Sequence, residues 1–224
     1  MSYHDLNSGL IVNSQRSMLN EENTVTDALK WMEAEELEHL IVISGQYFNK
    51  LISIEDLENQ KKFVTLKDIN PSCAQVVVKN TDSILKLWTN VIQNKISIIA
   101  ITGEDNRFVG SVSIKEIIQF FNHGFETEQS GSLIVIRMRK MDYLLSKIAT
   151  IVEEHRCIIL NSFITNVDDH DEMLLTIKLN CSEPDAIIQA LERHEYDQIE
   201  VFTPKQYVSE YQERYDELMR YLDV

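Results

Sequence analysis

The chain has 224 residues, of which 44% are hydrophobic and 25% are charged, and its formal net charge at pH 7 is −15. These proportions are typical of a globular protein, and the low content of glycine (6) and proline (3) excludes a collagen-like or low-complexity chain. The acidic excess disfavours contact with nucleic-acid phosphates and with anionic membranes, so we expect neither as a partner.

The first ordered segment that the sequence predicts begins near residue 24. Asn23 or Thr24 can cap a helix, because apolar residues recur after them at helical spacing. The β-branched run at 39–43 predicts a buried strand, and a second strand ends at residue 53. Ser53 then caps a short helix that opens with residues 54–57.

The same order of elements returns about 60 residues later. Thr81 or Asp82 is expected to cap a helix, and strands are predicted at 96–101 and 108–112 before a last helix at 114–121. The chain therefore contains an internal repeat. Each copy alone has too little core to be stable, so we expect the two copies to pack on each other.

The pattern changes after a polar segment at 122–131, which indicates a linker. Strands are predicted at 133–138, 157–167, 173–179 and 199–202, and helices at 142–156, capped by Asp142, and from Ser182 to residue 194. This β-α-β-β-α-β order is the ferredoxin-like arrangement. The tail at 205–224 is predicted to be one more helix, which packs on the domain or on a partner chain.

The repeat resembles a known family through the way in which each copy ends. Residues 50–57 read Lys-Leu-Ile-Ser-Ile-Glu-Asp-Leu, and residues 110–117 read Gly-Ser-Val-Ser-Ile-Lys-Glu-Ile. Residues 1–121 therefore resemble a CBS-domain pair, with units at about 1–70 and 71–121, in which Ser or Thr, two residues and Asp open the last helix of each unit. Residues 132–204 are similar to an ACT-like domain.

The whole chain, through its tail, resembles small bacterial CBS–ACT proteins of the acetoin-utilisation type, whose function is largely unassigned. The expected fold class is thus α/β (α+β), with a tandem CBS pair followed by a ferredoxin-like, ACT-like domain.

The resemblance implies that an adenosine-containing ligand binds between the CBS units. A carboxylate in the first turn of a helix can accept hydrogen bonds from ribose hydroxyls, and a phosphate is favoured beside the free N–H groups of a helix start. The candidate ligand-binding residues are Ser53, Asp56, Ser113, Glu116, Gly110, Lys115, His39 and Ile41. The alternative interpretation is that the serines and carboxylates only cap their helices.

Several residues depart from the family pattern. Glu116 is one methylene longer than the family's Asp, Lys50 stands where glycine is usual, and Ile41 stands where a proline is expected. In the ACT-like part, the turn at 139–143 contains no glycine, which disfavours an amino-acid site there. A triphosphate is disfavoured by the acidic charge, so a monophosphate or an S-adenosyl compound fits better than ATP.

The resemblance implies a non-enzymatic regulatory protein that forms a homodimer, senses an adenine nucleotide or S-adenosyl ligand, requires no cofactor and acts on a protein target. One alternative is a dimeric scaffold with empty CBS clefts, and another is an enzyme that acts on a nucleotide. The sequence contains no nucleophile elbow, P-loop or HExxH motif, so we predict no catalytic residue. The acidic run at 168–172 is predicted to be a solvated hairpin turn rather than a metal site.

The cellular location follows from three features of the sequence. The apolar runs are far shorter than the roughly 20 residues that cross a bilayer, and the N-terminal residues show no signal-peptide pattern. Cys73, Cys157 and Cys181 are widely spaced and odd in number, which is typical of reduced thiols. We therefore expect a cytoplasmic protein.

Overall fold

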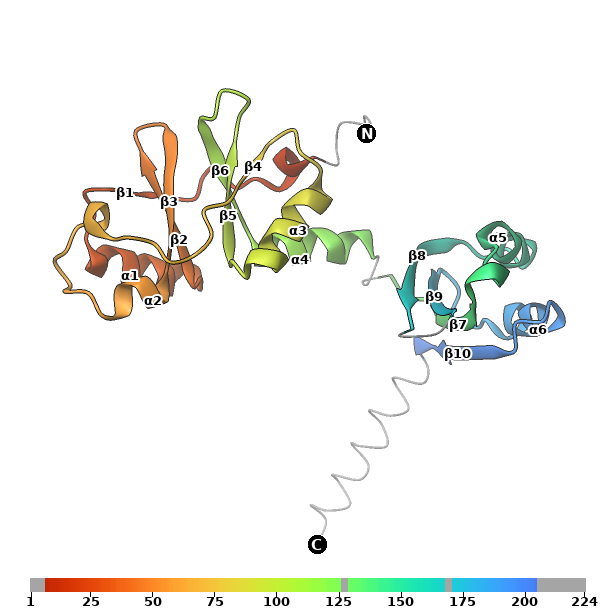
Figure 1. Ribbon diagram of the computed structural model, residues 1–224. Coiled ribbons are helices and arrows are strands. Elements are labelled where there is room, and N and C mark those ends of the chain that lie inside the picture. Colours follow the sequence, from red (N-terminus) through yellow and green to blue (C-terminus); the bar gives the residue numbers. More distant parts are fainter. Residues whose placement is uncertain (1–6, 126–128, 168–170, 205–224) are drawn as a thin grey trace, which may run out of the picture. The chain divides into compact units, whose positions relative to one another are not determined.

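The chain divides into two compact units, Met1–Phe120 and Phe121–Val224, in the computed structural model (Figure 1). The structure describes residues 7–125, 129–167 and 171–204, so the predicted tail helix at 205–224 and most of the predicted turn at 168–172 lie outside the described residues. Each unit combines helices with sheets, and the α+β class expected from the sequence is confirmed.

The first unit contains the predicted repeat, because the same elements occur twice in the same order. Each copy has a three-stranded sheet in which the first strand is parallel and the third antiparallel to the middle one (Figure 1). The first copy consists of β1 (Leu19–Asn20), α1 (Val25–Glu35), β2 (His39–Ser44), β3 (Tyr47–Ser53) and α2 (Ile54–Glu58). The second consists of β4 (Val77–Lys79), α3 (Ile84–Asn94), β5 (Ile98–Thr102), β6 (Phe108–Ser113) and α4 (Ile114–Gly124).

The short strands β1 and β4 were not predicted, because runs of two or three residues carry no periodic signal. Two 3-10 turns complete the first unit, η1 (Ser8–Ile11) and η2 (Leu66–Asp68).

Local sequence explains where the helices begin. Thr24 caps α1 through a capping box with Asp27, as predicted. The predicted caps of α3 were wrong, because Ser83 rather than Thr81 or Asp82 accepts the hydrogen bond from the third helical residue. The last helix, α4, continues to Gly124, three residues into the segment that we interpreted as a linker at 122–131.

The N-terminal segment crosses from the second repeat to the first (Figure 1). The backbone N–H of Ser8 donates to the carbonyl of Asp82 at 2.7 Å, and Asn13 forms an antiparallel bridge with Ser111 of β6. Only then does the chain enter β1, which pairs with β2. The first part of the expected unit at 1–70 is therefore bound to the second repeat, which periodicity along the chain does not reveal.

The second unit has the predicted βαββαβ order. It consists of β7 (Leu133–Arg139), α5 (Leu145–Glu154), β8 (Ile159–Asn166), β9 (Glu172–Leu179), α6 (Asp185–Arg193) and β10 (Gln198–Phe202), with a 3-10 turn η3 (Lys140–Asp142) after β7. Its antiparallel sheet has the order β10-β7-β9-β8, which is the ferredoxin-like arrangement. Side chains from both helices and from the central strands β7 and β9 form one core.

Two predicted helix caps in this unit were wrong. Asp142 lies in η3 and binds the Arg139 side chain, and α5 begins after Leu144 without a side-chain cap. Ser182 does not cap α6, which begins after Pro184. Burial and a hydrogen bond with Cys181 raise the pKa of Cys157 in this unit to about 11.

Candidate functional site

A cleft in the first unit joins both repeats at the start of α4. It encloses a volume of about 500 Å³ and is lined by the N-terminal segment, the end of α1 and the first turns of α4. The lining residues are Arg16, Ala34, Glu35, Glu36, Leu37, Ser113, Ile114, Lys115, Glu116 and Gln119. Its size lies within the usual range for small-molecule sites, about 300–1,000 Å³.

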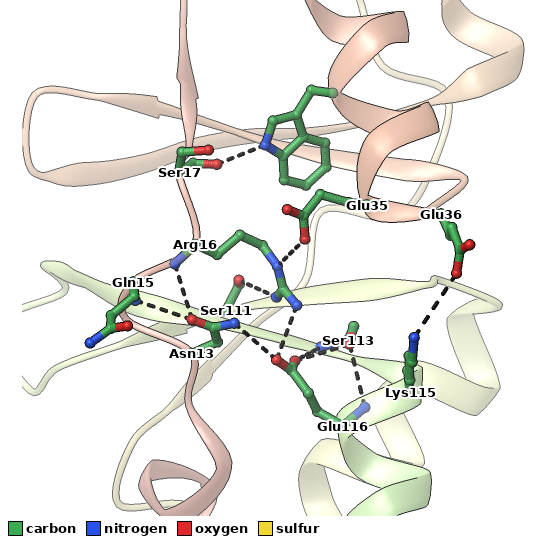
Figure 2. A network of polar contacts seen from close by, with 11 residues as sticks. Asn13, Gln15, Arg16, Ser17, Glu35, Glu36, Ser111, Ser113, Lys115 and Glu116 are labelled. Carbon is green, nitrogen blue, oxygen red and sulfur yellow. Dashed lines mark hydrogen bonds and ion pairs between the residues drawn. The ribbon is translucent and has the colours of Figure 1, made fainter.

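Arg16 is the central polar side chain of this cleft (Figure 2). Its side chain is only 7% exposed, and its Nε donates to Glu35 Oε2 at 2.8 Å on the first repeat. Its Nη1 donates to Ser111 Oγ at 2.8 Å and its Nη2 to Glu116 Oε1 at 3.0 Å on the second repeat. A single guanidinium therefore connects α1 of one copy to β6 and α4 of the other.

The carboxylate of Glu116 is held on both oxygens. Oε1 accepts hydrogen bonds from Asn13 Nδ2 at 3.1 Å and from Arg16 Nη2 at 3.0 Å (Figure 2). Oε2 accepts from the backbone N–H of Ser113 at 2.7 Å and from its hydroxyl at 3.0 Å. These four donors occupy about all the acceptor positions of a carboxylate, so a ribose would have to displace one of them.

The first repeat holds the equivalent carboxylate more loosely. Asp56 Oδ2 accepts from the backbone N–H of Ser53 at 2.9 Å, and Oδ1 accepts from that of Ser72 at 3.0 Å. Partial burial acts to raise the pKa of Asp56, but the hydrogen bonds from Ser72 and Ser53 outweigh it and hold that pKa below its usual value. Ser53 completes a capping box with Asp56, and the backbone N–H of Glu116 donates to Ser113 Oγ at 3.4 Å, so both serines cap their helices.

Two of the candidate residues serve the packing of the chain itself. Ile41 is fully buried, so it offers no surface to a ligand in this structure. A Cβ on Gly110 would lie 2.5 Å from Val12 Cγ1 and 2.8 Å from the carbonyl oxygen of Asn13. The N-terminal segment therefore fills the space beside Gly110, which the sequence analysis proposed as a ligand-binding residue.

His39 lies where the two repeats meet. The backbone N–H of Ser97 donates to His39 Nδ1 at 3.3 Å, and that of His39 donates to Ser97 Oγ at 3.0 Å. Burial lowers the pKa of His39 and outweighs the opposing effect of nearby carboxylates. A neutral ring whose Nδ1 accepts a hydrogen bond agrees with that direction.

Three of the eight candidate ligand-binding residues, Ser113, Lys115 and Glu116, line the cleft. Ser53, Asp56, Gly110, His39 and Ile41 do not line this cavity. Sequence analysis missed Arg16 and the end of α1, including Glu35. Arg16 belongs to no motif, and its one distinguishing feature is that the next arginine along the chain is residue 107.

A second cavity, of about 720 Å³, lies in the second unit around the turn between β7 and α5. Four of its charged side chains form two ion pairs: Arg139 binds Asp142 at 2.6 Å, and Arg137 binds Glu172 at 2.8 Å. In the described part of the chain, no three metal-binding side chains gather in an arrangement that could hold a metal ion. No helix among the described residues is long and apolar enough to span a bilayer.

Comparisons with known proteins find similarity at the level of structure. No protein-family model and no curated protein matches the chain. Among solved structures, a CBS domain pair/ACT domain protein from Thermotoga maritima has a TM-score of 0.46 and 18% identity, over 52% of this chain and 97% of that one. CBS domains of a transcriptional regulator from Streptococcus pneumoniae have a TM-score of 0.46 and 14% identity, over 51% and 98%.

A CBSX2 protein solved in complex with AMP has a TM-score of 0.44 and 14% identity, over 52% of this chain and 96% of its own. About half of this chain is thus similar in structure to CBS-domain proteins.

Proposed function

We propose that the first unit is a CBS-type regulatory module, without enzymatic activity, that binds an adenosine-containing small molecule in the cleft at Ser113 and Glu116. The observation that carries the proposal is the cleft itself, because both repeats and the N-terminal segment contribute to its lining. A ligand there contacts all three segments at once, so its binding energy depends on how they are packed. Homodimer formation, an ACT-like role for the second unit, a protein target and a cytoplasmic location stay predictions.

The charges around the cleft restrict the ligand. The lining contains three carboxylates, Glu35, Glu36 and Glu116, and two cations, Arg16 and Lys115. The N-terminus of α4 and the Lys115 ammonium favour one anionic group, whereas the surplus of carboxylates disfavours several. This balance supports a monophosphate, an uncharged nucleoside or an S-adenosyl compound over a triphosphate.

Arg16 supplies the mechanism. A ligand hydroxyl that donates a hydrogen bond to the Glu116 carboxylate must replace the hydrogen bond from Arg16 or from Asn13, because the bonds from Ser113 belong to the helix cap. Release of Arg16 from Glu116 leaves the guanidinium bound to Glu35 and to Ser111. The ion pair that connects Arg16 to the second repeat is then lost. Ligand binding is thereby linked to the packing of one repeat on the other.

The test is thermal unfolding of the full chain with adenosine, AMP, ADP, ATP and S-adenosylmethionine. A compound at a hundredfold excess over its Kd stabilises the folded state by about 2.7 kcal/mol, which raises Tm measurably. Ala34→Tyr, at an exposed lining residue, should abolish the shift, and Glu33→Tyr, on the same helix but outside the lining, should retain it. A shift that survives Ala34→Tyr would place the ligand elsewhere.

The second candidate function is a dimeric scaffold whose clefts take no ligand. The contacts of Glu116 favour it, because the chain's own donors already occupy both carboxylate oxygens. This alternative predicts no change in Tm with any compound of the panel. It also predicts a dimer in sedimentation experiments with and without those compounds.

A further inference from the structure

Two cysteines of the second unit stand opposite each other at the open end of the hairpin formed by β8 and β9 (Figure 1). Cys157 lies two residues before β8 begins, and Cys181 lies two residues after β9 ends. The register of these antiparallel strands pairs Ile159 with Leu179. The same register, continued by two residues, brings Cys157 opposite Cys181.

The residues between these two pairs hold the chain segments together. The backbone N–H of Asn180 donates to the carbonyl of Ile158 at 3.2 Å, and Asn180 Oδ1 accepts from the backbone N–H of Ile158 at 2.8 Å. In an antiparallel pair, hydrogen-bonded positions alternate with non-hydrogen-bonded ones, at which the Cα atoms are about 4.5 Å apart. Cys157 and Cys181 flank the bonded pair and therefore occupy a non-hydrogen-bonded position. A disulfide requires Cα atoms about 4.4–6.8 Å apart, so this position suits one.

The side chains of both cysteines lie on the same side of the sheet, because both pack against the core of the second unit. A hydrogen bond joins the two thiols. Both residues are only partly buried, so a small oxidant has access to this end of the hairpin. The third cysteine, Cys73, belongs to the first unit, where its thiol donates to the carbonyl of Leu51 at 3.2 Å.

We propose that Cys157 and Cys181 form a redox modification site, at which hydrogen peroxide converts the two thiols into a reversible intramolecular disulfide. The bond connects the segment between α5 and β8 to the segment between β9 and α6. It closes a loop that contains the whole β8–β9 hairpin, which restricts the unfolded chain and stabilises the second unit. This site lies in the second unit and does not depend on the function proposed for the cleft in the first.

The reaction uses one peroxide molecule for the two thiols. Cys157 keeps its proton at neutral pH, because its pKa is raised to about 11, so Cys181 reacts first. Its sulfur attacks one peroxide oxygen, the O–O bond breaks, and the departing hydroxide takes up the proton that Cys181 released.

The sulfur of Cys157 then attacks the sulfenic acid on Cys181. The S–S bond forms, the S–O bond breaks, and the hydroxide leaves with the Cys157 proton as a second water. The two sulfurs lose two electrons, which reduce the peroxide. A small dithiol reverses the reaction by thiol–disulfide exchange.

The test is oxidation of the full chain with hydrogen peroxide, followed by alkylation of the remaining thiols and mass spectrometry of the non-reduced peptides. We expect one linked peptide that joins Cys157 to Cys181, a mass loss equal to two hydrogen atoms, and a Cys73 that is still open to alkylation. Dithiothreitol should restore all three thiols. In urea, the same oxidation should also yield the other pairings, because the unfolded chain no longer holds these two cysteines together.

Two variants sharpen this test. Cys157→Ser should stop the reaction at the sulfenic acid of Cys181, which dimedone traps, and Cys73→Ser is the matched control that should leave the linkage unchanged. The proposal is overturned if Cys157 and Cys181 stay open to alkylation in the folded chain at a peroxide concentration that links them in urea. A linkage between two copies of the chain, seen as a dimer on a non-reducing gel, or the same mixture of pairings with and without urea would overturn it as well.

Discussion

The two repeats of the first unit open their last helices with the same serine–carboxylate box but hold the carboxylate by different partners. Asp56 accepts one backbone N–H on each oxygen, from Ser53 and from Ser72. Glu116 is longer by one methylene and reaches the N-terminal segment, where it meets Arg16 and Asn13. The longer side chain at position 116 thus reaches partners that Asp56 does not contact.

The two repeats also differ at the residue three positions before the capping serine, which is Lys50 in the first repeat and Gly110 in the second. Gly110 allows Asn13 to form an isolated antiparallel bridge with Ser111. In the first repeat the equivalent neighbour is the Gln75 side chain, whose amide pairs with the backbone of Leu51.

Lys50, at the position equivalent to Gly110, donates its Nζ to the carbonyls of Leu66, Lys67 and Ile69. One repeat therefore needs glycine for a backbone contact, and the other uses a long side chain to hold a loop. The two repeats share their helices and strands, but different parts of the chain pack against the third strand of each.

The largest expected effect comes from removing the guanidinium that joins the repeats. Arg16→Met removes a buried guanidinium and leaves the partly exposed carboxylates of Glu35 and Glu116 without their cation, so we expect the free energy of unfolding to fall by about 2–3 kcal/mol. Urea unfolding followed by tryptophan fluorescence measures it, because Trp31 and Trp88, the two tryptophans of the chain, both lie in the first unit.

The control for Arg16→Met is Arg107→Met. The pair of Arg107 with Asp105 has side chains that are 58% and 60% exposed, and exposed pairs contribute about 0–1 kcal/mol. Equal losses in the two variants would show that Arg16 does not clamp the repeats.

A smaller loss is expected from a methyl group at the crossing of the N-terminal segment. Gly110→Ala places a Cβ against Val12 and Asn13, and relief of that overlap requires a shift of the segment, at a cost of about 1–3 kcal/mol. The same urea experiment measures it. Gly124→Ala, where a Cβ meets nothing within 4 Å, should leave stability unchanged or slightly higher. A neutral Gly110→Ala would contradict the close packing described here.

The smallest expected effect is a pH dependence that only the first repeat can show, because Ile98 of the second stands where the first has His39. Burial holds the pKa of His39 below its unfolded value of about 6.5, so the unfolded chain binds the proton more strongly. Stability is then complete above about pH 6.5 and falls as the pH drops toward the pKa of the folded state.

Urea midpoints of the first unit between pH 7.5 and pH 5 test this dependence. In His39→Gln, whose side chain can still accept from Ser97, the decline should be shallower. An identical decline in both proteins would assign the pH dependence to other groups.

Prediction from the sequence succeeded where the determinants are local. The caps at Thr24, Ser53 and Ser113 each depend on a carboxylate three residues away, and all three form. The order of the elements in both units was also predictable, because hydrophobic periodicity extends over whole strands and helices. The predicted caps of α3, α5 and α6 were wrong, because Ser83 caps α3 in place of Thr81 or Asp82, and α5 and α6 begin after Leu144 and Pro184 without a side-chain cap.

The sequence by itself determined the duplicated helix–strand–strand–helix units, the βαββαβ order and three of the residues that line the cleft, Ser113, Lys115 and Glu116. Tertiary structure alone decided that Arg16 joins them, since its partners stand 19, 95 and 100 positions along the chain. Such contacts are specified by packing in space, and no periodicity or spacing records them. The crossing of the N-terminal segment, and the glycine that it requires at position 110, belong to the same class.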